Sequence, residues 1–144
     1  MRLKLSLMLI VLLAISLLPG ACDKPTCGDG EWQNIAWKLK SYGTTDNLQP
    51  VLGNANITLQ FNSNDEEVNG SGGCNHYFGS YTINSRNCEL KISGLGATEM
   101  ACLDAALMQQ EQKYFSLLQT AGKIEVKNGE LRINCGNEVL VYTH

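Results

Sequence analysis

Residues 69–83 read NGSGGCNHYFGSYTI, and the rest of the chain is arranged around this segment. Three glycines in four positions, Gly70, Gly72 and Gly73, precede Cys74. Glycine at this density indicates a backbone that adopts positive φ or approaches another segment closely. Aromatic and β-branched residues follow, so we expect a tight turn that leads into a β-strand.

A second segment, residues 96–102 (GATEMAC), is the predicted partner of this turn. It ends in Cys102 and lies just before residues 105–120, which have the clearest helical pattern in the chain. Both Cys74 and Cys102 have small neighbours, and we expect their two segments to face each other. This arrangement predicts a Cys74–Cys102 disulfide.

The remaining cysteines leave the rest of the connectivity open. Besides Cys22 there are five, an odd number, so an oxidising compartment would leave one thiol unpaired within the domain. We add Cys88–Cys135 as a second pair only because both residues border predicted strands. Cys27 is then the odd thiol.

The first 21 residues have the pattern of a secretory signal. Arg2 and Lys4 precede an apolar run over residues 7–18, which is short of the roughly 20 residues that span a bilayer. Residues 17–22 (LLPGAC) resemble a bacterial lipobox, which predicts cleavage before Cys22 and its modification with acyl chains such as palmitate. The alternative is an ordinary signal peptide with a chance cysteine.

The mature chain is predicted to contain a tether and one domain. Residues 22–34 read as a lipidated N-terminus and polar tether, and residues 35–144 are long enough for one domain with a core. The formal net charge of the whole chain is −3, and its lysines are scattered. This charge distribution lacks the basic footprint of a nucleic-acid-binding protein. We expect a monomer that meets the membrane through its lipid.

Hydrophobic periodicity predicts an α+β fold that is mainly β. Strand patterns, separated by a loop over 43–56 and a turn over 62–67, cover residues 35–39, 57–61, 78–83, 89–93, 123–126, 131–134 and 139–142. Asn128-Gly129 is a strong hairpin signal. Residues 105–120 form the predicted helix, with Asp104 as its N-cap. We expect a curled antiparallel sheet, or a partly closed barrel, packed on this one helix.

Glu111 breaks the pattern of the predicted helix, because it lies between Leu107 and Tyr114 on the apolar face. An unpaired buried carboxylate is too costly to retain. We therefore expect Glu111 to be largely buried and to accept hydrogen bonds from the turn at residues 70–75 or from the Thr98 region, in a structural role. In the alternative, the helix is rotated and Glu111 is solvated at the rim.

These short motifs together resemble the META domain family, to which the bacterial heat-shock lipoprotein HslJ belongs. The resemblance covers residues 31–144, and its motif positions are Gly73, Cys74, Asn75, Gly79, Tyr81, Thr98, Met100 and Cys102. It implies a small, mostly β domain with one helix, often in a cell-envelope lipoprotein linked with stress, motility or secretion. The resemblance supplies no catalytic residue set and no cofactor.

Two chemical interpretations of the motif are weak. Cys74 and His76 could act as a thiol and its base, but positions i and i+2 in a strand merely share a face, and no third group orients the pair. A metal site from Cys74, His76 and Cys102 lacks the spacing usual for zinc. Trp37 and Tyr81 are expected in the core. We expect no catalytic site, metal or cofactor.

The predicted function is therefore that of a membrane-anchored, non-enzymatic envelope lipoprotein with a binding or structural domain. The domain would face the periplasm or the exterior and would have an envelope protein as its partner. A carrier of a small apolar ligand or lipid is the alternative if the sheet encloses a cavity. An inhibitor of a secreted hydrolase is another, if residues 70–77 form a protruding loop with exposed aromatic side chains.

Overall fold

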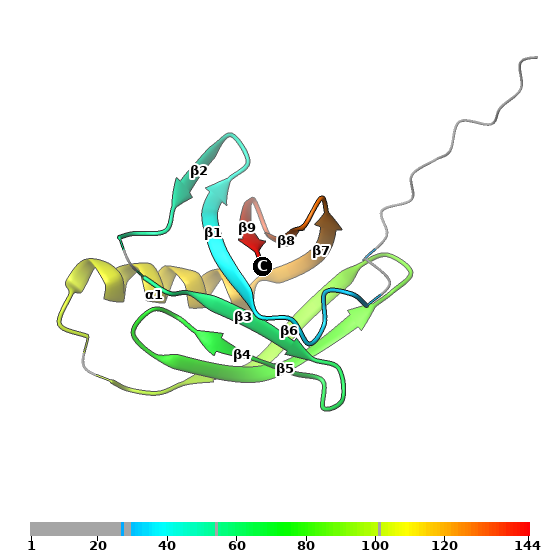
Figure 1. Ribbon diagram of the computed structural model, residues 1–144, viewed down its shortest axis with the longest axis horizontal. Helices are drawn as coiled ribbons and strands as arrows, with labels where there is room; N and C mark the ends of the chain where they lie inside the picture. Colours follow the sequence, from blue (N-terminus) through cyan, green and yellow to red (C-terminus); the bar gives the residue numbers. More distant parts are fainter. Residues whose placement is uncertain (1–26, 28–29, 54, 101) are drawn as a thin grey trace, which may run out of the picture.

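The computed structural model describes Cys27 and residues 30–53, 55–100 and 102–144 (Figure 1). The signal segment, Cys22 and most of the predicted tether lie outside the described residues, so the interpretations placed on them stay predictions. No helix among the described residues has the length and apolar character needed to cross a membrane.

The described strands form one antiparallel sheet that closes on itself. Its strands are β1 (Trp37–Thr44), β2 (Asn47–Pro50), β3 (Thr58–Asn62), β4 (Glu67–Ser71), β5 (His76–Asn84), β6 (Glu89–Ala97), β7 (Ala121–Lys127), β8 (Glu130–Cys135) and β9 (Glu138–Thr143). The order is β2-β1-β3-β4-β5-β6-β7-β8-β9, and β1 also pairs with β9. Eight strands therefore close into a barrel, and β2 is an extra strand beside β1, which confirms the predicted fold class.

The helix α1 (Ala105–Gln119) connects β6 to β7 and runs beside the barrel. Figure 1 places its N-terminal end at one end of the long axis of the molecule and the β5–β6 hairpin at the other. Asp104 is the N-cap, and its carboxylate accepts hydrogen bonds from the backbone N–H groups of Ala106 and Leu107. The predicted helix is confirmed.

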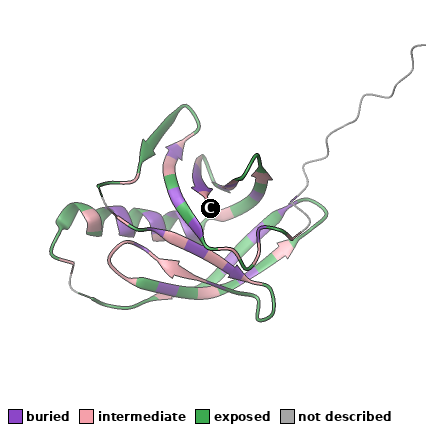
Figure 2. Cartoon of the chain, in the orientation of Figure 1, coloured by how far each residue is buried: buried purple, intermediate pink, exposed green. Residues whose placement is uncertain are grey.

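The interior of the barrel is filled by apolar and aromatic side chains, and buried residues alternate with exposed ones along the strands (Figure 2). Three buried tyrosines add a polar chain to this core. Tyr142 Oη donates to Tyr114 Oη at 3.2 Å, Tyr114 and Tyr77 hydroxyls lie 2.9 Å apart, and Tyr77 Oη donates to Thr58 O at 2.8 Å. Burial raises the pKa of all three tyrosines well above the ordinary value. The hydroxyls therefore remain neutral and satisfy one another.

Two strands were missed by the periodicity. The predicted loop over residues 43–56 contains β2, whose residues are all exposed, so no apolar alternation marks it. The predicted turn over 62–67 ends one residue inside β4, whose buried apolar residue is Val68. The hairpin at Asn128-Gly129 is confirmed, since both residues adopt positive φ, 53° and 77°.

The packed domain begins before Ile35, within the predicted tether. Trp32 is 2% exposed and packs edge-on against Phe61, with ring centroids 4.9 Å apart. Its carbonyl accepts a hydrogen bond from Trp37 Nε1 at 2.8 Å. The Gly and Pro residues of this region predicted no packed structure, so the sequence did not indicate that Trp32 belongs to the core.

Candidate functional site

The structure joins Cys74 to Cys102, with Cα atoms 5.7 Å apart, as predicted. The predicted Cys88–Cys135 pair is wrong. Cys88 is bonded to Cys27 instead, with Cα atoms 5.2 Å apart, so Cys27 is not the odd thiol. Cys135 is the free cysteine of the described residues. It lies buried at the end of β8, whereas Cys27 lies against the β5–β6 turn, with its Sγ 3.5 Å from Ser85 O, and bonds to Cys88 there.

Burial makes Cys135 a poor nucleophile. Its pKa is raised to about 12 by burial, and the nearby Glu138 carboxylate adds to the shift. The thiolate is the reactive form of cysteine, and this pKa leaves almost none of it near neutral pH.

Glu111 is the centre of the motif. It is 4% exposed and faces the turn between β4 and β5, as predicted. Its Oε1 accepts hydrogen bonds from the backbone N–H groups of Cys74 at 3.1 Å and Asn75 at 2.6 Å. Its Oε2 accepts a third from Asn75 Nδ2 at 2.7 Å. The carboxylate thus satisfies turn N–H groups that have no partner in the sheet, and the alternative with a solvated Glu111 is wrong.

Asn75 links this carboxylate to the second segment. While its Nδ2 donates to Glu111, its Oδ1 accepts from the backbone N–H of Met100 at 2.7 Å and from Thr98 Oγ1 at 3.1 Å. His76 and Thr98 continue the connection, since His76 N donates to Thr98 Oγ1 and Thr98 N donates to His76 O. The turn, the segment before α1 and the helix are therefore joined as one unit.

The glycines at positions 70, 72 and 73 allow both a close approach of another segment and a positive φ, as expected from the sequence. A Cβ on Gly72 would lie 2.5 Å from Glu111 Oε1 and 2.6 Å from the Phe115 ring. These two side chains of α1 can therefore pack against position 72 only if it is glycine. Gly73 adopts φ +111°, a conformation that side chains disfavour. A Cβ on Gly70 would lie 2.0 Å from Thr58 O.

The remaining motif positions support the barrel. Gly79 lies at a β-bulge in the pairing of β5 with β6, where a Cβ would lie 3.0 Å from Ser93 O. Tyr81 is 2% exposed in the core, and its hydroxyl accepts a hydrogen bond from Gln33 Nε2 at 2.6 Å. These two residues are structural, as is the core residue Trp37.

The disulfide removes the chemistry considered for Cys74. Because the Cys74 and Cys102 sulfur atoms are bonded to each other, neither is available as a nucleophile or as a metal ligand. His76 is exposed and binds Thr98 through its backbone alone in the described contacts. The turn, the segment before α1 and the helix thus present to solvent a surface whose backbone is fixed by the disulfide and by the hydrogen bonds of Glu111 and Asn75.

That surface is apolar. Leu103 is fully exposed at 102% and Met100 at 60%. Together with the half-buried Leu107, they line a shallow groove of about 380 Å³ that also reaches the disulfide. We call Met100, Leu103 and Leu107 the Met–Leu surface. No sequence pattern identified it, because exposed apolar residues cannot be told from core residues without the fold.

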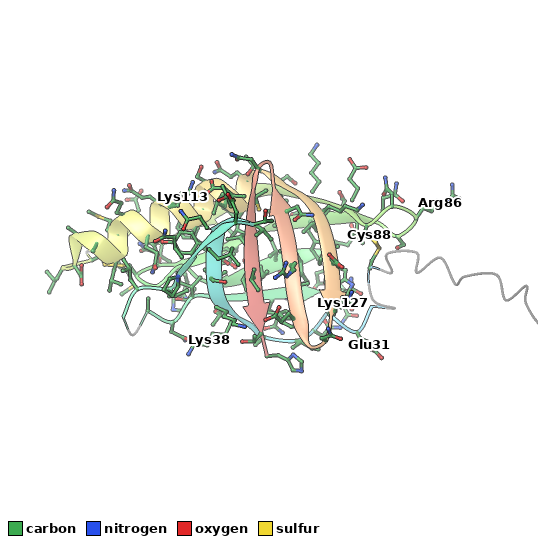
Figure 3. The ribbon with its side chains drawn as sticks, turned by 90° about the horizontal axis from the view of Figure 1, so that it is seen from above. Glu31, Lys38, Arg86, Cys88, Lys113 and Lys127 are labelled. Atoms are coloured by element: carbon green, nitrogen blue, oxygen red, sulfur yellow. A yellow bond between two sulfur atoms is a disulfide. The ribbon has the colours of Figure 1, made fainter. Side chains whose placement is uncertain are left out.

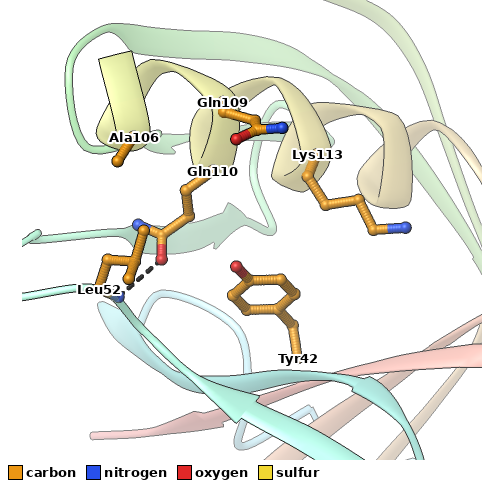
Figure 4. Close-up of a pocket in the computed structure, with 6 residues that line it drawn as sticks. All are labelled: Tyr42, Leu52, Ala106, Gln109, Gln110 and Lys113. Carbon is orange, nitrogen blue, oxygen red and sulfur yellow. Dashed lines mark hydrogen bonds between the residues drawn. The ribbon is translucent and has the colours of Figure 1, made fainter. Parts of the chain in front are cut away.

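A second, smaller groove of about 270 Å³ lies between α1 and the chain that follows β2 (Figure 4). Tyr42, Leu52, Gln110 and Lys113 line it, and Gln110 Oε1 accepts a hydrogen bond from Leu52 N at 2.7 Å. Among the described residues, Gln110 Nε2 has no partner although it is buried. The Lys113 ammonium already pairs with Glu138.

Comparison with known proteins agrees with this architecture. Residues 30–144 match the META domain. An NMR structure of a protein from Burkholderia xenovorans is 24% identical and superposes with a TM-score of 0.65, covering 78% of this chain and 82% of that chain. A crystal structure of a DUF4847 family protein from Bacteroides vulgatus is 12% identical, with a TM-score of 0.57, and covers 79% of this chain and 94% of that chain. No protein with a curated description matches the chain.

Proposed function

The chain belongs to the META domain family, and we propose that it is a lipid-anchored, non-enzymatic protein of the bacterial envelope that binds a protein partner through the Met–Leu surface. The observation that carries this proposal is an exposed apolar surface on a rigid support. Leu103 directly follows Cys102, and Met100 is held by Asn75. Exposed apolar side chains gathered in one place mark interaction sites, and a preorganised surface loses little entropy on binding.

Two disulfides within one small domain support an oxidising compartment outside the cytoplasm. Lipid anchoring through Cys22 and a role in envelope stress come from the sequence pattern and the family resemblance. The protein would act as a monomer, because closure of the barrel leaves few free strand edges and β2 is short.

The structure weighs against the two alternatives. A carrier needs an internal cavity, whereas Tyr77, Tyr114 and Tyr142 occupy the barrel interior and bond to one another. A hydrolase inhibitor with a protruding aromatic loop at residues 70–77 loses its motivating feature, because Tyr77 is 2% exposed and the turn is bound to Glu111.

The lipid anchor is tested by metabolic labelling with an alkyne analogue of palmitate. The wild-type protein is expected to take the label, and Cys22→Ser is expected to lose it, since the lipobox places the acylated thiol at Cys22. Cys135→Ser is the matched control and is expected to remain labelled. A Cys22→Ser protein that still carries the label would contradict the anchor.

The binding surface is tested by site-specific photocrosslinking in native envelopes. A photoreactive residue in place of Met100 is expected to capture a protein partner, and the same residue in place of Leu48, exposed on β2, is not. Leu103→Glu is expected to abolish capture from position 100 without changing the thermal unfolding temperature, because Leu103 is fully exposed. Equal capture from positions 48 and 100, or capture that survives Leu103→Glu, would refute the assignment of this surface.

A further inference from the structure

The Cys27–Cys88 disulfide attaches the N-terminal tether to one end of the barrel. Cys88 lies in the turn between β5 and β6, and Figure 3 shows it with Arg86 at one end of the long axis. We propose that this disulfide determines which end of the domain faces the membrane. The β5–β6 hairpin end lies on the phospholipid headgroup layer, and the Met–Leu surface points away from it. This inference rests on the proposed acylation of Cys22.

The disulfide limits how far the domain can move from its anchor. Cys22 and Cys27 are five residues apart, and a fully extended chain reaches at most about 18 Å over that length. Without the disulfide, the first firmly packed residue would be Trp32, and ten residues reach about 36 Å. The disulfide thus halves the free length of the tether.

The strand β5 supplies the length for comparison. It starts at His76, beside the Cys74–Cys102 disulfide, and ends at Asn84, beside the turn that holds Cys88. At about 3.3 Å per residue, these ends are separated by roughly 26 Å. The two disulfides therefore mark opposite ends of the barrel, and Figure 1 places the start of α1 at the end away from the hairpin.

These two lengths decide the orientation. A tether of about 18 Å is shorter than the roughly 26 Å along β5, so the hairpin cannot be lifted from the membrane by the length of this strand to bring the Met–Leu surface down onto it. A tether of about 36 Å would permit inversion. The disulfide thereby keeps the Met–Leu surface on the aqueous side.

The chemistry of the two ends agrees with this orientation. The hairpin exposes four polar residues, Asn84, Ser85, Arg86 and Asn87, whose side chains can donate hydrogen bonds to phosphate and other headgroup oxygens. The exposed apolar residues Met100 and Leu103 lie near the other end. A protein partner, rather than lipid, would then cover them.

Energy transfer from a labelled domain to a labelled bilayer measures the orientation. The acylated full chain would be placed in vesicles of phosphatidylethanolamine and phosphatidylglycerol that contain an acceptor dye on the headgroups. A donor dye would replace Arg86 in one sample and Leu103 in another. We expect stronger transfer from position 86 than from position 103.

Two changes to the tether test the cause. Cys27→Ser combined with Cys88→Ser opens the disulfide, and insertion of Gly-Ser-Gly-Ser-Gly after Asp23 lengthens the tether to about 36 Å with the disulfide intact. Both are expected to reduce the difference in transfer between positions 86 and 103. The insertion keeps the test valid if the double substitution impairs folding.

The outcomes separate this inference from the proposed function. Transfer from position 103 that equals or exceeds transfer from position 86, in an acylated protein, would overturn the orientation alone. A difference that the insertion leaves unchanged would overturn the role of the tether. A protein that carries no acyl label would contradict the proposed anchor, and with it the premise of this inference.

Discussion

Replacement of Glu111 by Leu is expected to lower the free energy of unfolding by about 4 kcal/mol, since each buried donor left unpaired costs about 1–3 kcal/mol. Three donors lose their acceptor: Cys74 N, Asn75 N and Asn75 Nδ2. The leucine side chain is similar in size, so the loss reflects hydrogen bonds rather than a cavity. Chemical denaturation under oxidising conditions, with both disulfides intact, measures the change.

Glu111→Gln is expected to cost less, about 1–2 kcal/mol, because its amide oxygen can still accept from the two backbone N–H groups. Its NH₂ group would then face Asn75 Nδ2, which is also a donor. Asn75 cannot turn its amide to relieve this, because its Oδ1 is held by Met100 N and Thr98 Oγ1. The order Leu, then Gln, then wild type in increasing stability is thus a consequence of the fixed amide.

Gln112→Leu is the matched control, since it introduces the same side chain at an exposed position of α1. It is expected to change the free energy of unfolding by no more than about 0.5 kcal/mol. A Glu111→Leu protein as stable as this control would show that the carboxylate does not hold the turn.

The burial of Glu111 could be predicted because helical periodicity is a local property. Positions 107, 111 and 114 share a face in any α-helix, so a carboxylate there must find donors in the fold. The role of Asn75 could not be predicted in the same way. Its three side-chain hydrogen bonds reach residues 23 to 36 positions away, and only the closed barrel brings these residues together.

The disulfides show the same limit. Cys74 and Cys102 could be paired because both lie in short motifs that the glycine pattern and the helix start bring together. Cys27 has no such context, and its partner is 61 residues away. No pattern near Cys27 indicates the β5–β6 turn, and only the fold brings that turn beside it. A strand as short and exposed as β2 is likewise stabilised by its pairing with β1, not by its own composition.

Gly70 explains why glycine is required within a strand. Its Cβ, if present, would lie 2.0 Å from Thr58 O and 2.8 Å from Tyr77 Oη, the two atoms that form a hydrogen bond with each other. Gly70→Ala must therefore separate β4 from β3 and break that bond. Tyr77 would also move relative to Tyr114, which disturbs the tyrosine chain in the core.

The expected cost of Gly70→Ala is about 4 kcal/mol, because overpacking costs about 1–3 kcal/mol and a broken buried hydrogen bond adds a similar amount. Gly122→Ala is the control, because its nearest atom would be Asn134 O at 3.7 Å and its φ is not left-handed. It is expected to be neutral or to stabilise by up to about 1 kcal/mol. Thermal and chemical unfolding of both variants measure the difference. If Gly70→Ala has the same unfolding temperature and free energy of unfolding as Gly122→Ala, the close approach of β3 and β4 is not required for the barrel.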